Sequence, residues 1–173
     1  MTDGLAVAGL VFVAALLQAT LFASLDLFGG SPDVLVLVLI GIALLRGSIT
    51  GALAGFGGGL LLDVLTLDTL GLTALLLSLA GYWTGRYGET TGRDRAHAPV
   101  VAVLVVTILV LVLGFLLHFL IGEEVSARRA FVEAMVAGVG LNLVLAAPVF
   151  AVCRALLRPR ERDGRAVEVQ LLG

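Results

Sequence analysis

The sequence has few charged and few aromatic residues. Of its 173 residues, 14% are charged and 6% are aromatic, whereas 60% are hydrophobic. A soluble domain has about 25% charged residues, so a water-facing fold of this size cannot cover so much apolar surface. The scarcity of aromatic residues also argues against a large aromatic-lined pocket. These shortages predict an integral membrane protein whose surface is partly covered by lipid.

Cysteine is nearly absent, and lysine is missing altogether. The single cysteine, Cys153, cannot form an internal disulfide and has no metal-ligand spacing around it. No basic residue precedes the first apolar stretch, so we expect that stretch to remain as a membrane anchor rather than to be cleaved as a signal peptide. The sequence also has no phosphate-binding loop, nucleophile elbow or pair of catalytic carboxylates. We therefore predict neither an enzyme nor a cofactor-binding protein, and nothing supports nucleic-acid binding.

Six apolar segments follow one another, and we expect each of them to be a helix. A spanning helix needs about 20 apolar residues, and the second and third segments are short enough to form one long tilted helix instead. We predict an all-α bundle of about six transmembrane helices in one domain over residues 1–158, followed by a polar cytoplasmic tail over 159–173. The segments cover residues 4–25, 34–45, 48–62, 70–87, 100–121 and 131–157.

The positions of the arginines favour six spans over five. With six spans and the N-terminus inside, nine arginines lie on the cytoplasmic side, and only Arg128 and Arg129 lie outside. This is a strong positive-inside bias. Five spans would leave Arg46 near the bilayer centre, at a cost of roughly 2.5–3.5 kcal/mol. We therefore predict that both termini are cytoplasmic and that acidic residues, Asp33 and Asp63 among them, lie at the outer face.

A line of glycines that ends in an aspartate marks the third segment. Gly51, Gly55 and Gly59 follow at a spacing of four residues, and Asp63 completes the series. This spacing lets another membrane helix approach backbone to backbone. A carboxylate with apolar neighbours is costly in a membrane and is therefore a functional candidate. Asp63 is expected either to contact a ligand or partner or to cap the fourth helix; the alternative is a loop aspartate in water. We predict that this line is a surface for helix packing or partner contact.

Other polar or irregular residues fall within or beside the predicted helices. Gln18 and Asn142 lie near the middle of the first and last helices, where amide side chains usually form hydrogen bonds between helices. Pro148 is expected to kink the last helix and to free a backbone carbonyl. Asp68 precedes the fourth helix and is expected to cap it.

Several of these residues together resemble the MreD family. The resemblance rests mainly on residues 31–85, and residues 141–150, LNLVLAAPVF, resemble the last helix of that family. Because size and span count also agree, the resemblance covers essentially the whole chain. The residues that carry it are Gly55, Gly59 and Asp63 in a G-x-x-x-G-x-x-x-D pattern, then Gly71, and Tyr82 in LAGYWTG.

This resemblance implies a non-enzymatic subunit of the bacterial rod-shape and cell-elongation machinery in the cytoplasmic (inner) membrane. The implied partners are an MreC-like bitopic protein, a RodA-like glycosyltransferase with its class B penicillin-binding protein and, indirectly, MreB-like filaments. The implied function is to scaffold MreC and lateral peptidoglycan synthesis.

The alternative function is that of a substrate-binding S component of an energy-coupling-factor vitamin transporter. S components resemble this chain in size and in their glycine-rich helices, and the ladder Ala15, Ala19 and Ala23 resembles the one they use against their coupling subunit. A vitamin site needs several polar or aromatic groups converging at the outer face. The lone tryptophan, Trp83, is instead expected near the cytoplasmic end of the fourth helix.

Overall fold

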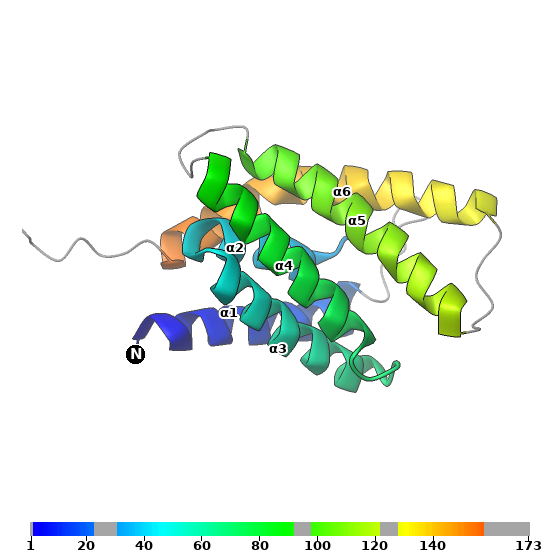
Figure 1. Ribbon diagram of the computed structural model, residues 1–173, viewed down its shortest axis with the longest axis horizontal. Coiled ribbons are helices and arrows are strands. Elements are labelled where there is room, and N and C mark those ends of the chain that lie inside the picture. The colour runs from blue at the N-terminus through cyan, green and yellow to red at the C-terminus, as the bar shows by residue number, and fades with distance from the viewer. Residues whose placement is uncertain (1, 23–30, 92–97, 122–127, 158–173) are drawn as a thin grey trace, which may run out of the picture.

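The protein is an all-helical bundle in the computed structural model, which describes residues 2–22, 31–91, 98–121 and 128–157 (Figure 1). The predicted all-α fold with six helices is confirmed, and a π-helical turn, η1, continues the first helix. The predicted tail over 159–173 lies outside the described residues. The elements are α1 (Thr2–Leu17), η1 (Gln18–Phe22), α2 (Val34–Arg46), α3 (Ser48–Thr66), α4 (Leu72–Thr91), α5 (Ala98–Ile121) and α6 (Arg128–Leu157).

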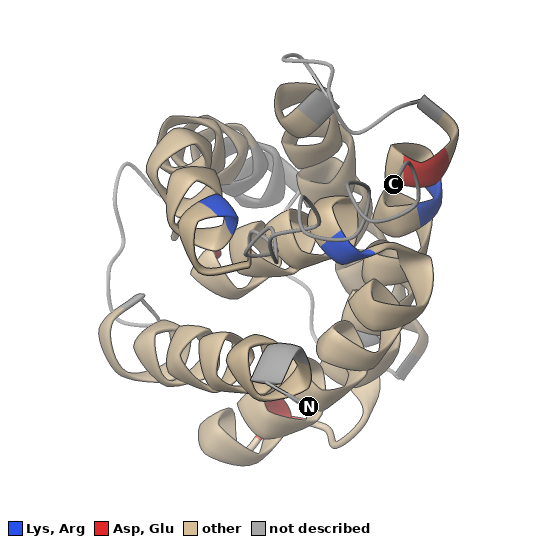
Figure 2. Ribbon diagram, turned by 90° about the vertical axis from the view of Figure 1, so that its left-hand side faces the viewer, with Lys and Arg blue, Asp and Glu red and all other residues tan. Residues whose placement is uncertain are grey.

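Four stretches have both the length and the apolar composition needed to cross a membrane, whereas the sequence predicted about six spans. Helix α2 is apolar but has 13 residues, which correspond to about 20 Å at 1.5 Å per residue. Helix α4 is longer but ends in a polar turn that contains Arg86 and Glu89. The four candidate spans are Gly4–Leu21, Ser48–Thr66, Pro99–Leu117 and Val136–Leu157. Figure 2 shows how few charged residues the described helices carry.

Helix α2 lies at the centre of the bundle. Every residue from Val34 to Leu44 is buried, and the helix contacts each of the other five. A helix that is hydrophobic on all sides is expected to be covered on all sides. The length of α2 is well below the roughly 30 Å of a hydrocarbon core. We therefore describe it as a short central helix around which the longer helices pack.

A single glycine separates α2 from α3. Gly47 has a φ of 97°, a left-handed conformation that glycine adopts without steric cost, and its N–H donates to the Ala43 carbonyl at 2.8 Å. The chain turns back at this point, so that α3 packs on α2. The alternative prediction, that the second and third segments form one long tilted helix, is therefore wrong.

The two ends of the bundle differ in which elements meet there (Figure 1). At one end α1 begins, α2, α4 and α6 end, and the Arg46 guanidinium donates to the carbonyl of Leu157 at 3.1 Å. We call this end the Arg46 end. At the opposite end α3 turns into α4 close to Asp63, and we call it the Asp63 end. Of all pairs of helices, α3 and α4 make the most extensive contact.

The contact between α3 and α4 predicts opposite outcomes for two neighbouring glycines. A leucine at Gly55 would collide with the backbone of α4, whereas a Cβ at Gly57 meets no atom within 4 Å. Overpacking costs about 1–3 kcal/mol where the surroundings cannot shift. In detergent, Gly55→Leu should therefore melt several degrees below the natural protein, and Gly57→Leu should melt close to it. Equal melting temperatures for the two variants would contradict this packing.

Candidate functional site

The glycine line of α3 lies directly against the backbone of α4. A Cβ at Gly51 would lie 2.6 Å from the Gly81 carbonyl oxygen, and a Cβ at Gly55 or Gly59 would also come closer than 3.0 Å to backbone atoms of α4. Real Cβ atoms essentially never come so close to backbone, so these three positions require glycine. We call this contact the glycine seam; its α4 backbone neighbours are Gly81, Leu77 and Ala74.

Helix α4 contributes glycines of its own, which the sequence analysis did not assign to helix packing. A Cβ at Gly81 would meet the backbone of Gly51, and one at Gly85 would meet the backbone of Ser48, both closer than 3.0 Å. Gly81 and Gly85 are also four residues apart. A search for two small-residue ladders in consecutive segments would have paired α3 with α4, since close helix approach in membranes needs small residues on both sides.

Asp63 closes the glycine seam at the Asp63 end. Its side chain is 1% exposed, and its Oδ2 accepts a hydrogen bond from the Gly71 N–H at 2.8 Å. Gly71 has a φ of 92°, and its carbonyl accepts the N–H of Leu75, so it is the residue immediately before α4. The alternative of a loop aspartate in water is therefore wrong. Within the described residues, the second oxygen of Asp63, Oδ1, is buried and has no hydrogen-bond partner.

The sequence offered both Asp63 and Asp68 as caps of the fourth helix, and the structure gives this role to Asp63. Asp68 is exposed, and its Oδ1 accepts from the N–H of the next residue, Thr69, at 2.6 Å. The helix begins at Leu72, three residues later than this local turn. The sequence offered the cap of the fourth helix as one role for Asp63, beside contact with a ligand or partner, and the hydrogen bond to Gly71, eight residues further on, agrees with the cap.

A second carboxylate holds the glycine seam at the Arg46 end. Glu89 Oε1 accepts hydrogen bonds from the backbone N–H of Ser48 at 2.8 Å and from its hydroxyl at 3.0 Å, while Arg86 lies 3.4 Å from Oε2. These donors lower the pKa of the Glu89 carboxyl, with the Ser48 backbone N–H as the largest cause. Glu89 thus supplies the cap that Gly47, which has no side chain, cannot give to α3.

The side-chain amides of Gln18 and Asn142, which the sequence placed near the middle of the membrane, both form hydrogen bonds with the backbone at the start of α2. Gln18 Oε1 accepts from the N–H of Val34 at 2.8 Å, and its Nε2 donates to the Pro32 carbonyl at 3.3 Å. Asn142 Oδ1 accepts from the N–H of Asp33 at 2.8 Å. These side chains accept hydrogen bonds from backbone N–H groups at the start of α2. Because this helix start lies inside the bundle, water cannot serve as the acceptor.

Asp33 belongs to this internal cluster, although the sequence placed it at the outer face. Its Oδ1 accepts from the N–H of Val36 at 3.0 Å, which makes it the N-cap of α2. Asn142 Nδ2 donates to the Thr107 hydroxyl at 3.2 Å, so that α5 and α6 are tied to the same point. Gln18, Asp33, Thr107 and Asn142 also line a polar cavity of about 100 Å³.

Tyr82 and Pro148, the remaining predicted residues, lie apart from the glycine seam. The Tyr82 side chain is 41% exposed and packs edge-on against Trp83, with ring centroids 5.9 Å apart. Pro148 lies inside α6, which continues from residue 128 to 157, and it lines an apolar groove of about 320 Å³ between α1, α2 and α6. The kink at Pro148 stays a prediction. Within the described ranges, no three His, Cys, Asp or Glu side chains come together.

The fold and these contacts define an all-helical membrane protein organised around a backbone-to-backbone helix pair. The model of the MreD family, rod shape-determining protein MreD, matches residues 3–158, and the chain therefore belongs to the MreD family. No curated protein and no solved structure matches the chain. Members are non-enzymatic membrane proteins of the cell-elongation machinery, so the family and the absence of enzymatic activity that the sequence predicted are both confirmed.

Removal of the Asp63 side chain tests its role as a cap. Asp63→Ala leaves the buried N–H of Gly71 without its acceptor, which costs about 1–3 kcal/mol. Asp68→Ala is the matched control, because it removes an exposed carboxylate with one local bond. Thermal unfolding in detergent should show a clear loss for Asp63→Ala and little change for Asp68→Ala. Equal stability of the two variants would show that Asp63 does not hold the start of α4.

The bond between Glu89 and Ser48 predicts a pH dependence. Because the folded-state pKa of Glu89 is lowered, its stabilising effect is present above the ordinary value of 4.5 and is lost as the pH falls through the lowered value. Glu89→Gln keeps an acceptor but no charge. The natural protein should have a higher melting temperature than this variant at neutral pH. The difference between the two melting temperatures should disappear at acid pH. A difference that stays constant with pH would contradict the assignment.

Proposed function

We propose that the chain is a non-enzymatic membrane subunit that scaffolds an MreC-like bitopic protein and the lateral peptidoglycan synthesis complex. The observation that carries the proposal is the match of the MreD family model to residues 3–158. In this proposal a RodA-like glycosyltransferase and its class B penicillin-binding protein act in the same complex. MreB-like filaments align the complex indirectly from the cytoplasm.

The proposed location is the bacterial cytoplasmic membrane, with both termini in the cytoplasm. Two features support this orientation. Helix α1 begins and helix α6 ends at the same end of the bundle (Figure 1), as an even number of crossings requires. Arg46 and Arg86 are also held at this end, through Leu157 and Glu89 respectively, as the positive-inside rule expects of a cytoplasmic face. We propose that α2 and α4 complete six crossings, with α2 shielded from lipid by the other helices.

The glycine seam is proposed to give the scaffold its rigidity rather than to receive a partner. The α3 face that carries Gly51, Gly55 and Gly59 is covered by α4, so another helix has no access to it. Asp63 is buried and works as an internal cap. In this proposal these residues fix the helix pair on whose outer surface a partner can bind.

The exposed aromatic pair on α4 is the proposed contact with the MreC-like protein. Of the residues that the sequence offered for partner contact, Tyr82 is the one with an exposed side chain, and its neighbour Trp83 is 62% exposed. Tyrosine and tryptophan are enriched among the residues that dominate interface energies. The seam on the other side of α4 holds this surface in place.

The S-component alternative has less support. The polar cavity around Asp33 and Asn142 measures about 100 Å³, below the 300–1,000 Å³ of ordinary small-molecule sites. The two larger grooves are lined mainly by apolar side chains. Strong thermal stabilisation of the purified chain by a vitamin would favour the S component over the scaffold.

Co-purification tests the scaffold and its contact surface together. The chain is co-expressed with the MreC-like protein of the same genome and purified in mild detergent. We expect the two to elute as a complex, and Tyr82→Ala to weaken it at least fivefold, since a hot-spot aromatic contributes more than about 1 kcal/mol. Phe56→Ala, which removes an exposed aromatic side chain from α3 instead of α4, is the control. No complex with the natural chain would refute the scaffold, whereas equal complexes for both variants would refute only the surface.

A further inference from the structure

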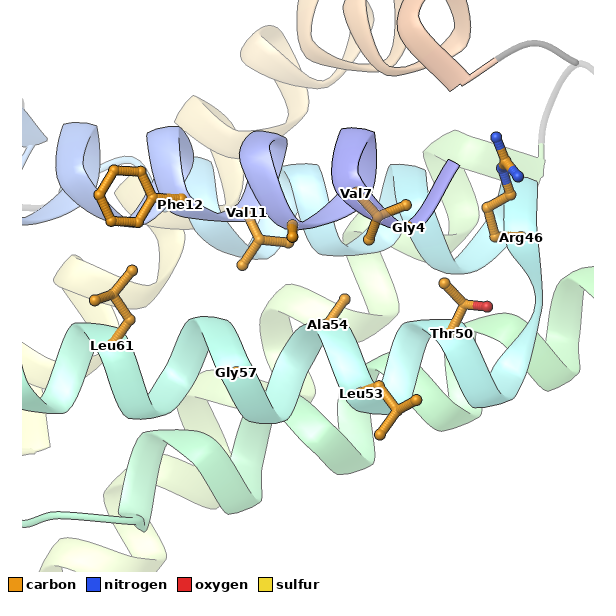
Figure 3. A pocket seen from close by; sticks show the side chains of 11 residues that line it. Gly4, Val7, Val11, Phe12, Arg46, Thr50, Leu53, Ala54, Gly57 and Leu61 are labelled. Atoms are coloured by element: carbon orange, nitrogen blue, oxygen red, sulfur yellow. The ribbon is translucent and has the colours of Figure 1, made fainter. Parts of the chain in front are cut away.

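The polar cavity at the start of α2 brings a carboxylate and neutral oxygen groups together inside the bundle. It measures about 100 Å³, and its polar lining comes from Gln18 of η1, Ser31 and Asp33 before α2, Thr107 of α5 and Asn142 of α6. The larger groove between α1 and α3 is lined mainly by apolar side chains instead (Figure 3). The polar cavity is therefore the place where four parts of the chain meet around groups that can bind a polar ligand.

The cavity lies at a depth where a charge is costly. Leu157, where α6 ends, is fifteen residues after Asn142, and this stretch of helix is about 22 Å long at 1.5 Å per residue. In a hydrocarbon core of roughly 30 Å, Asn142 is thus well away from the Arg46 end. Ser31 is exposed, so the cavity can be reached from outside the bundle. A carboxylate at this depth needs a partner for its charge.

The described surroundings of Asp33 balance its charge in part. Asp33 Oδ1 accepts from the N–H of Val36 at 3.0 Å, and the N-terminus of a helix is equivalent to about half a positive charge. The N–H groups of Asp33 and Val34 are already bonded to the amide oxygens of Asn142 and Gln18. Of the described residues that line the cavity, none is basic. A substantial part of the negative charge therefore remains for a ligand.

We propose that the cavity binds one alkali-metal cation, with sodium as the ion to test, beside the carboxylate of Asp33. Hard cations prefer oxygen ligands, and the cavity offers neutral ones from Gln18, Thr107 and Asn142. The Thr107 oxygen accepts one hydrogen bond, from Asn142 Nδ2 at 3.2 Å, and each of the two amide oxygens accepts one from the backbone. Such oxygens have two lone pairs, so each retains one for a cation.

The size and the charge of the cavity favour a monovalent cation. A single water needs about 10–15 Å³, so 100 Å³ has room for an ion and for waters that complete its shell. The affinity of oxygen sites for Ca²⁺ depends on the number of charged ligands, and Asp33 is the one acidic residue among those described around the cavity. A bound sodium ion neutralises Asp33 and ties η1, α5 and α6 to the start of α2.

Substitutions of Asp33 and Thr107 test the ligands. Asp33→Asn removes the charge but keeps an oxygen that can accept from Val36, and asparagine is a good N-cap. Thr107→Ser keeps the hydroxyl group and Thr107→Val removes it. Asp68→Asn is the matched control for the loss of a carboxylate, because Asp68 is exposed and does not line the cavity.

Thermal unfolding of the purified full-length chain in detergent, in sodium chloride or in choline chloride, measures the binding. Equal ionic strength in the two salts keeps the screening of surface charges the same. We expect sodium to raise the melting temperature of the natural chain and of Asp68→Asn by about 3–6 °C at a tenfold excess over its dissociation constant. Asp33→Asn should melt at the same temperature in both salts, and Thr107→Val should respond less than Thr107→Ser.

Two results would overturn the proposal. One is an equal melting temperature of the natural chain in the two salts, and the other is a full sodium response in Asp33→Asn. Should Asp33→Asn not fold, the two Thr107 variants decide, and equal responses of Thr107→Val and Thr107→Ser would then count against the site. Neither the MreC-like protein nor the glycine seam enters this test, so its outcome is independent of the proposed scaffold.

Discussion

The rest of the structure depends on the direct backbone contact between α3 and α4. Glycines on both helices bring the main chains so close that a single methyl group at Gly51, Gly55 or Gly59 would collide with the opposite helix. In a membrane, lipid tails are as apolar as leucine, so helices associate through close packing and hydrogen bonds rather than by excluding water. The seam supplies the packing, and the carboxylates of Asp63 and Glu89 supply hydrogen bonds at its two ends.

The central helix α2 follows from the same constraint. A helix of 13 residues that is covered on every side brings its first amide groups into the bundle, where each unsatisfied group costs several kcal/mol. Gln18, Asp33 and Asn142 provide the acceptors, from α1's π-helical continuation, from the chain before α2 and from α6. The polar residues inside this apolar protein are thus placed where a buried helix begins.

The sequence predicted the helices well because their apolar runs end at strong signals. Arginine and glycine mark the break at Gly47, and the predicted starts at Val34 and Ser48 agree with the structure. The ends were less accurate: α3 continues to Thr66 rather than residue 62, because threonine and leucine give no clear stop. The spacing of the glycines identified the α3 side of the glycine seam. It did not identify α4 as the helix that covers it, because this depends on where the chain turns after α3.

The polar residues show the same limit. Asp33 was expected only as part of an acidic outer face, yet it caps α2 inside the fold. For Asp63 the sequence left a cap, a ligand or partner contact and a loop position open, and the structure shows the cap. Their role depends on backbone N–H groups whose positions only the folded chain defines. The hydrogen bonding of Asn142 and Gln18 was easier to predict, since a side-chain amide in the middle of a membrane must find a partner. The sequence could not show that they accept from backbone N–H groups at the start of α2. Glu89 was missed because it follows the apolar run and looks like an ordinary solvated residue.

A cross-linking test in native membranes addresses the central claim, that the glycine seam is internal to one chain. The Ser78 hydroxyl donates to the Ala52 carbonyl oxygen at 3.2 Å across this seam, so a short bifunctional thiol reagent should link cysteines at these two positions in a Cys153→Ala background. We expect a cross-link within a single chain that forms equally with and without the MreC-like protein. Cross-links between two chains, or loss of the link when the partner is present, would contradict it.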